Sequence, residues 1–166
     1  MNKIEEIKEL IKDLPPEKAL SNISNAFPGK VTFSTSLGFE DQVMSHFIFS
    51  NNIPIEVFTL DTGRLFNETH SVLNNTIERY KKTIRVYYPQ REELERLVSE
   101  KGPNSFYTSV ENRKECCFIR KVEPLKRALK GKSIWVTGIR ADQSDNRHDM
   151  SALEWDETNQ LIKFHP

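Results

Sequence analysis

The chain has 166 residues and no formal net charge, with 37% hydrophobic and 29% charged residues. This balance is typical of one soluble globular domain and excludes an intrinsically disordered chain. No apolar run approaches the about 18 residues that a membrane span requires, so we expect no membrane segment. The polar N-terminus lacks an apolar signal segment and the chain has only two cysteines, which together predict a cytoplasmic, reducing location.

The first predicted elements are two short helices, at residues 3–13 and 16–26, separated by Pro15-Pro16. A β-prone run at residues 31–33 leads into a Ser/Gly-rich loop and then a helical pattern at residues 40–50. Further strands are predicted at residues 53–60, 83–88 and 133–138, and further helices at residues 67–81, 90–100 and 114–130. We expect the last of these helices to be interrupted or kinked near Pro124. Residues 152–166 predict a β-hairpin around a polar Asp-Glu-Thr-Asn turn.

Strands that alternate with helices predict βαβ units and a parallel sheet flanked by helices, an α/β fold. In such sheets ligands bind beyond the carboxyl ends of the strands. Three polar, glycine-containing segments lie at those ends: STSLGFED (34–41), LDTGR (60–64) and GIRADQSDNR (138–147). Their shared position predicts a binding site at one edge of the sheet.

Each of these segments also has a purely structural interpretation. The Ser-rich loop opens a helix whose N–H groups attract an anion, but taken alone it favours an ordinary N-capped helix with Ser36 as the cap. Asp61-Thr62-Gly63 is a turn that either places Arg64 on a nucleotide or only reverses the chain. The arginines of the third segment suit phosphate or sulfate, although most such loops carry solvated charges.

The basic residues between positions 111 and 147 number ten, against five acidic ones. This surplus is too small and too local for a nucleic-acid stripe, so we expect no nucleic acid partner. A small-anion pocket and an ordinary basic helix both explain it.

Four segments occur here in the order found in a known family: STSLGFEDQV, TLDTGRLFNETH, ECCFIRKVEPL and VTGIRADQS. From about residue 30 to the last residue, the chain resembles the adenylylsulfate and phosphoadenylylsulfate reductases of sulfate assimilation. The resemblance implies an adenine nucleotide α-hydrolase-like fold of the PP-loop type, with its C-terminal part missing. Residues 1–28 are then a helical segment of the same domain, and residues 29–166 a nucleotide-binding domain that is incomplete at its C-terminus.

The resemblance also assigns binding roles to particular positions. The modified pyrophosphate loop corresponds to Ser34, Thr35, Ser36 and Gly38, and the second nucleotide loop to Leu60, Asp61, Thr62, Gly63 and Arg64. The family's lysine near the substrate corresponds to Lys121. The arginine loop that faces the phosphosulfate corresponds to Arg140, Gln143, Ser144 and Arg147.

Both cysteines of the chain, Cys116 and Cys117, are adjacent. Neighbouring Cα atoms are about 3.8 Å apart, which is short of the usual span of a disulfide, so a bridge between them is not expected. Two adjacent cysteines in a helix are often small buried apolar residues. In the cluster-bearing branch of the family, however, such a pair joins a distant Cys-x-x-Cys to hold a [4Fe–4S] cluster.

The reaction implied by the resemblance is the thiol-dependent reduction of adenylylsulfate to sulfite and AMP. A nucleophilic cysteine forms an S-sulfocysteine, and thioredoxin or a glutaredoxin-like reductant then releases sulfite. Neither that cysteine nor the Cys-x-x-Cys pair is among these 166 residues, so there is no catalytic residue to assign. We therefore expect a partial chain that holds two cluster ligands of four and does not turn over alone. The four histidines, at positions 46, 70, 148 and 165, are scattered and show no ligand spacing.

Other functions remain open at the level of sequence. A preference for phosphoadenylylsulfate is the nearest alternative, although the Cys-Cys pair favours adenylylsulfate. A PP-loop ATP pyrophosphatase or sulfurtransferase is disfavoured because the loop lacks the Gly-Gly pair of that branch. A non-catalytic nucleotide-binding fragment is a third alternative, and the sequence also leaves a homo-oligomer open.

Overall fold

The computed structural model describes residues 3–138 and 151–166. Within them the strands form one sheet in the order β3-β2-β1-β4-β6-β5. All neighbouring strands are parallel except β5 and β6, which form an antiparallel hairpin. The strands are β1 (Val31–Ser34), β2 (Glu56–Leu60), β3 (Arg85–Tyr87), β4 (Ile134–Val136), β5 (Leu153–Asp156) and β6 (Leu161–Phe164). The predicted parallel sheet is thereby confirmed.

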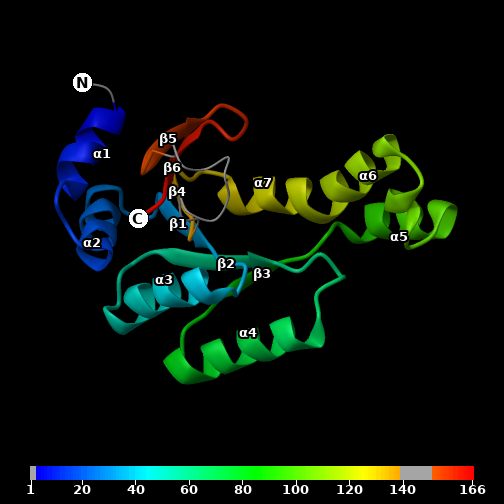
Figure 1. The fold of residues 1–166 in the computed structure, drawn as a ribbon, viewed down its shortest axis with the longest axis horizontal. Helices are drawn as coiled ribbons and strands as arrows, with labels where there is room; N and C mark the ends of the chain where they lie inside the picture. The colour runs from blue at the N-terminus through cyan, green and yellow to red at the C-terminus, as the bar shows by residue number, and fades with distance from the viewer. Residues whose placement is uncertain (1–2, 139–150) are drawn as a thin grey trace.

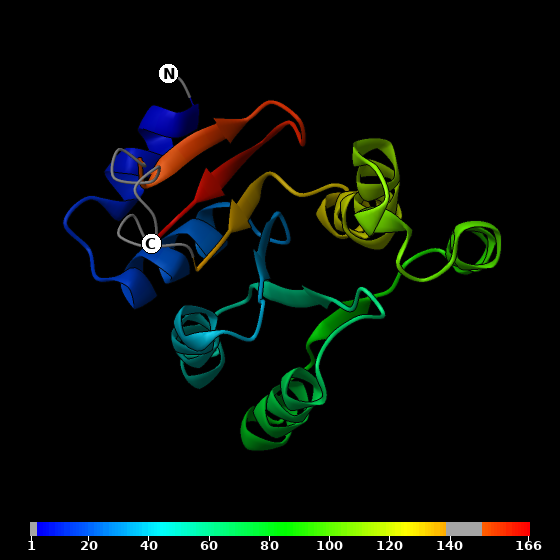
Figure 2. The same ribbon diagram turned by 45° about the vertical axis from the view of Figure 1, so that its right-hand side comes forward.

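Helices cover both faces of this sheet. They are α1 (Lys3–Ile11), α2 (Pro16–Ala26), α3 (Phe39–Ser50), α4 (Asn67–Tyr80), α5 (Arg91–Lys101), α6 (Val110–Cys117) and α7 (Glu123–Leu129), with a 3-10 turn η1 (Ser105–Tyr107) before α6. The first four helices lie on one side of the sheet and α7 on the other (Figure 2). Helices α5 and α6 stand away from the sheet, at the opposite end of the molecule from α1 and α2 (Figure 1). None of the helices in the described ranges has the length and apolarity to cross a membrane.

The main core lies between the sheet and the helices α1 to α4. Strand residues such as Val31, Phe33 and Val136 pack there against buried helix residues such as Leu20 and Ile48. Helix α2 begins at Pro16, whose fixed φ suits a first helical position and whose missing N–H would have had no partner there. Because α1 and α2 contribute fully buried residues to this core, the N-terminal helices are an integral part of it.

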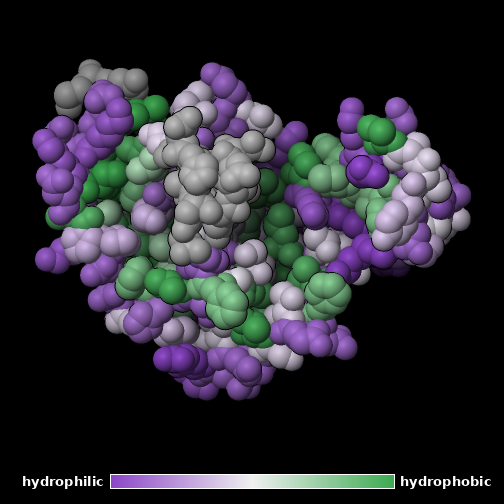
Figure 3. All heavy atoms as spheres, in the orientation of Figure 1, coloured by the Kyte–Doolittle hydropathy of each residue, from purple (hydrophilic) through white to green (hydrophobic). Residues whose placement is uncertain are grey.

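A smaller core lies on the opposite face, under α7. Phe58 and Leu161 of the sheet pack against Ala128 and Leu129 of the helix, with Trp135 at the margin. This second face is covered only in part, because α5 and α6 extend outward instead of lying on the sheet. Figure 3 shows apolar side chains gathered where the outer helices join the body that contains the sheet.

The helix expected at residues 114–130 is continuous but contains a widened turn. A π-helical segment, η2 (Phe118–Val122), joins α6 to α7, and the Glu123 N–H donates to the Phe118 carbonyl. Pro124 cannot donate a backbone hydrogen bond, and its ring disfavours the regular α-helical turn before it. The predicted irregularity is thus present, as a π turn on the N-terminal side of Pro124.

The predicted C-terminal hairpin is confirmed, and β6 also inserts beside β4. The backbone N–H groups of Thr158 and Asn159 donate to the Asp156 carboxylate, which closes the turn. Strand β6 pairs with β4 in parallel, with Val136 opposite Phe164. The hairpin therefore extends the sheet beyond β4 and brings its own side chains to the edge where ligands bind.

Candidate functional site

The strand order reverses at β1 and β4, because the chain passes from β1 to β2 and β3 on one side and to β4 on the other. Crevices that bind ligands in open α/β sheets lie at such a point, beyond the carboxyl ends of the strands. A cavity of about 460 Å³ lies here. Its lining comes from the loops after β1, β2 and β4, from the hairpin, and from α3, α4, η2 and α7. It includes Ser34, Thr35, Ser36, Asp41, Leu60, Thr62, Thr69, Lys121, Leu125, Trp135, Thr137, Gly138, Glu154, Lys163 and His165.

The loop after β1 is fixed by Asp41. Both the backbone N–H and the Oγ of Ser36 donate to Asp41 Oδ2, at 2.5 and 2.6 Å, and the Asp41 residue is only 8% exposed. The backbone of Leu37, at φ 66°, adopts a left-handed conformation, and its N–H donates to Thr35 Oγ1. The alternative interpretation of Ser36 as an N-cap is wrong, because Gly38 occupies the N-cap position of α3 and no side chain caps it. Ser36 instead belongs to the wall of the cavity.

Gly138 must be glycine because Asp41 lies against it. A Cβ at this position would lie 2.0 Å from Asp41 Oδ1, a distance that no real contact permits. The buried carboxylate therefore joins the loop after β1 to the end of β4, the two strands between which the order of the sheet reverses.

The loop after β2 is closed by its own aspartate. Asp61 Oδ1 accepts the Gly63 N–H at 2.8 Å, and Asp61 Oδ2 lies 2.8 Å from Nε2 of His70 on α4. Gly63 has φ 73°, the left-handed region that glycine tolerates best. Arg64 points out of this cavity: its guanidinium donates to the Pro103 carbonyl and lies 5.0 Å from the Phe106 ring centroid. Thr62, at the middle of the turn, faces the cavity.

The hairpin supplies a wall that sequence patterns did not predict. Lys163 Nζ lies 3.4 Å from a Glu154 oxygen, 3.2 Å from an Asp156 oxygen and 5.3 Å from the Trp135 ring centroid. Burial alone would raise the pKa of Asp156, but hydrogen bonds from Asn159 and the nearby Lys163 cation outweigh it and lower the pKa. Trp135 Nε1 of β4 donates to Ser34 Oγ at the end of β1 at 2.8 Å, so the ends of these two neighbouring strands are joined beside the hairpin.

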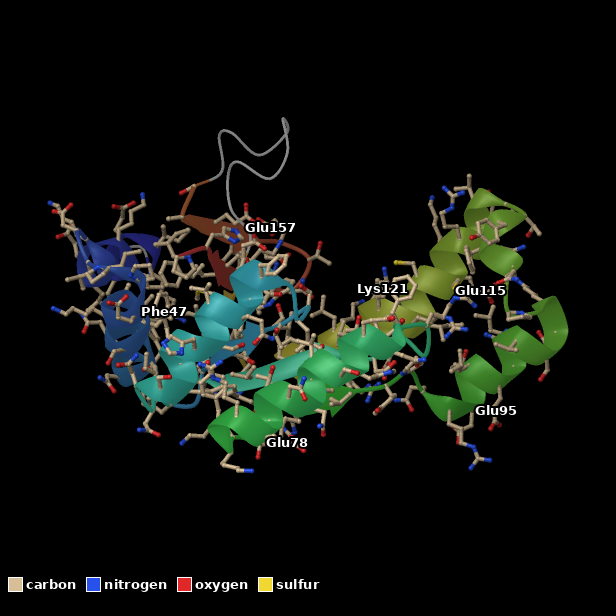
Figure 4. All side chains as sticks on the ribbon, turned by 60° about the horizontal axis from the view of Figure 1, so that its bottom comes forward. Phe47, Glu78, Glu95, Glu115, Lys121 and Glu157 are labelled. Carbon is tan, nitrogen blue, oxygen red and sulfur yellow. The ribbon has the colours of Figure 1, made fainter. Side chains whose placement is uncertain are left out.

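A second cavity, of about 380 Å³, lies beside the first and contains both cysteines. Cys116 is buried, Cys117 is exposed, and neither forms a disulfide. Four cationic side chains line this cavity: Arg64, Arg113, Arg120 and Lys121. Among the described residues, no carboxylate lines it. The two cavities share Thr62, Leu65 and Lys121. Figure 4 shows Lys121 on the sheet side of Glu115, toward the junction between the outer helices and the body.

The structure thus brings six predicted residues, Ser34, Thr35, Ser36, Leu60, Thr62 and Lys121, to one cavity. Gly38 begins the neighbouring helix, while Asp61 and Gly63 shape the second loop from behind. The predicted arginine-loop residues, Arg140, Gln143, Ser144 and Arg147, lie outside the described residues. Trp135 and Thr137, which lie within a predicted strand, were missed, whereas Gly138 begins the predicted third segment. Asp41 ends the predicted first segment, but its hydrogen bonds to Ser36 and the part played by the hairpin residues depend on tertiary contacts that the sequence pattern does not show.

The two cysteines are fewer than the ligands that an iron–sulfur cluster takes. A [4Fe–4S] cluster is commonly held by four thiolates, and Cys116 and Cys117 are the only cysteines of the chain. Among residues 3–138 and 151–166, no group of three or more potential metal ligands comes together. The cationic lining suits an anionic cluster, yet these residues do not hold one alone.

Comparison with known proteins decides the family. Residues 30–166 match the model of the phosphoadenosine phosphosulfate reductase domain. The chain belongs to this reductase family. The adenosine 5'-phosphosulfate reductase of Rhizobium meliloti is 49% identical over 138 residues, which are 83% of this chain and 52% of that protein. The enzyme of the same name from Allochromatium vinosum is 46% identical over 136 residues, 82% of this chain and 53% of that protein.

Solved structures agree on the fold of this reductase domain. The crystal structure of phosphoadenylyl-sulfate reductase from Candida auris, a phosphate complex, matches with a TM-score of 0.80 at 22% identity, over all of this chain and 79% of that one. Yeast FAD synthetase matches with a TM-score of 0.50 at 16% identity, over all of this chain and 55% of that one. Both likenesses concern the fold alone. The chain spans about half the length of the curated relatives that it matches.

Proposed function

We propose that this chain is the nucleotide-binding part of an enzyme that reduces adenylylsulfate to sulfite and AMP. The observation that carries this proposal is the 460 Å³ cavity at the point where the strand order reverses, which opens beside a cationic cavity that contains two thiols. A nucleotide in the first cavity would extend an anionic group toward Lys121, which lines both. Family membership and the names of the relatives support the same substrate class.

In this proposal the loops bind and orient, while thiols carry out the reduction. The Ser-rich loop, the Thr62 turn and Lys121 hold the phosphosulfate still and stabilise charge on the departing phosphate. A cysteine thiolate attacks the sulfate sulfur, the sulfur–oxygen bond to the phosphate breaks, and AMP leaves with the electron pair. A second thiolate, from thioredoxin or a glutaredoxin-like protein, attacks the S-sulfocysteine, forms a disulfide and releases sulfite. The predicted Arg140, Gln143, Ser144 and Arg147 remain proposed contacts of the phosphosulfate.

We also propose that Cys116 and Cys117 are two of the four thiolate ligands of a [4Fe–4S] cluster in the whole enzyme. Their adjacency and the four cations around them support this role, because a cluster with four thiolates carries negative charge. A reducing, cytoplasmic location is part of the same proposal, since free thiols are required. The described residues hold no complete ligand set for such a cluster.

Calorimetric titration of the 166-residue chain tests the substrate class. We expect AMP and adenylylsulfate to bind with one site each, and adenylylsulfate to bind more tightly because it carries an additional anionic group. Equal or tighter binding of phosphoadenylylsulfate would favour the alternative reductase substrate. Binding of ATP with release of pyrophosphate would replace the proposal with an ATP pyrophosphatase or sulfurtransferase.

A turnover assay with thioredoxin tests the division of roles. We expect no sulfite from the 166-residue chain and adenylylsulfate, because both of its thiols belong to the proposed cluster pair. Sulfite release by this chain alone would show that one of them is the nucleophile and would refute the assignment.

A further inference from the structure

Arg120 is a buried cation without a described counter-ion. The residue is only 7% exposed, and its Nη1 donates to the backbone carbonyl of Thr62 at 2.6 Å. Its Nε has no hydrogen-bond partner among the described residues, and none of the described carboxylates forms an ion pair with it. Burying a charge is costly unless it is paired or has a specific task. Among the described residues, the hydrogen bond of Arg120 is to the Thr62 turn, which lines the first cavity.

The opposite side of this contact is shaped to receive the guanidinium. The residue after Thr62 is Gly63, and a Cβ on Gly63 would lie 3.2 Å from Arg120 Nη1. Arg120 itself lies in the π turn η2, three and four residues after the two cysteines. One side chain therefore joins the turn of the first cavity to the helix that supplies the thiols of the second.

We infer that Arg120 is a positioning residue that couples the two cavities: an adenine nucleotide bound at the Thr62 turn restrains the helix that bears the cysteines. This inference rests on the proposed function for the identity of its ligand. The bond to the Thr62 carbonyl holds the helix in register with the turn. A nucleotide that stabilises the turn therefore opposes local opening of the helix around Cys116.

The two cysteines provide an internal measure of such opening. Cys116 is buried, so we expect it to react slowly with an alkylating reagent and faster when its helix opens, whereas the exposed Cys117 reacts without opening. Brief iodoacetamide pulses followed by peptide mass spectrometry give the rate at each position. With AMP at ten times its dissociation constant, we expect the alkylation of Cys116 to slow by about five- to tenfold, close to the largest effect that ligand linkage allows at this concentration. The alkylation rate of Cys117 should change little.

Variants separate coupling from binding. Arg120→Ala should still bind AMP in the calorimeter, but AMP should no longer slow Cys116 alkylation, and Arg120→Lys should restore part of the effect. Arg113→Ala is the matched control, since it removes a cation from the same cavity without touching the turn, and it should retain full protection. If AMP binds the unmodified chain and leaves the Cys116 rate unchanged, the coupling is refuted whatever the variants do. If AMP does not bind the unmodified chain at all, the proposed function fails instead.

Discussion

Asp41 is the residue on which the shape of the candidate site depends most. Its carboxylate accepts both donors of Ser36 and lies against Gly138, so it holds together the ends of β1 and β4. Hydrogen bonds to a charged group contribute about 1.5–3 kcal/mol each, more than most surface contacts. The helical spacing of apolar residues predicts a helix that includes Asp41. That spacing does not reveal that the Asp41 side chain accepts hydrogen bonds from the preceding loop.

Removing this carboxylate should destabilise the fold. We expect Asp41→Ala to lower the free energy of unfolding by about 3 kcal/mol, because two short hydrogen bonds to a charge are lost. Glu68→Ala is the control, since Glu68 also lies in the first turn of a helix but is exposed, and it should cost less than about 0.5 kcal/mol. Urea unfolding of both variants measures the difference. Equal losses would show that Asp41 has no special role.

Gly138 provides a test of the contact itself. Gly138→Ala should be strongly destabilising in the unmodified chain, because its new Cβ would meet the Asp41 carboxylate. In an Asp41→Ala background the same change should cost little. A double-mutant cycle by urea unfolding should therefore give a coupling energy of at least about 1 kcal/mol between the two positions. Additive effects would contradict the packing described for this pair.

At the scale of elements, most of the fold follows from local pattern. Sequence patterns predict the buried strands, the start of α2 at Pro16 and the turn at Asp156, because a few neighbouring residues determine each of them. The parallel insertion of β6 beside β4 is not local, because it joins residues 134–136 to residues 162–164. The hairpin wall of the cavity, with Lys163 and Glu154, was missed for that reason. The π turn was predicted only as an irregularity, since Pro124 marks where a helix changes but not how.

The hairpin should lose stability in acid. The pKa of Asp156 is lowered below its ordinary value of 3.8 in the folded chain. Its contribution to stability is therefore present above pH 3.8 and is lost as the pH falls through the folded pKa. We expect Asp156→Asn to lower the melting temperature near pH 6, and this difference from the unmodified chain to shrink between pH 4 and pH 2.5. A difference that is constant or grows in acid would contradict the assignment.

At the scale of the whole molecule, two cavities meet at Thr62 and Lys121. The parallel sheet predicts the first cavity because it brings the ends of its strands together. The second depends on how far α5 and α6 extend from the sheet, which no short sequence pattern specifies. The resemblance to known reductases located its cysteines, while the cations around them became apparent only in the fold.

Lys121 should distinguish two ligands of the first cavity. We expect Lys121→Gln to weaken the binding of adenylylsulfate by about tenfold, because roughly one charge-assisted contact is lost. AMP should be affected less, because it lacks the sulfate that would extend toward the second cavity. Lys130→Gln, which removes an equal charge outside both cavities, is the control. Calorimetry of the three proteins measures these affinities, and equal weakening of both ligands would place Lys121 at the AMP part of the site.

We propose that an adenine nucleotide occupies the 460 Å³ cavity. Thr69 of α4 lines this cavity, whereas Ser71 lies two residues along the same helix, exposed and outside it. The most direct measurement is calorimetric titration of AMP into the unmodified chain, Thr69→Trp and Ser71→Trp. We expect binding to the unmodified chain and to Ser71→Trp, and none to Thr69→Trp, whose indole would fill the cavity. Undiminished binding to a folded Thr69→Trp variant would place the nucleotide elsewhere and contradict the account.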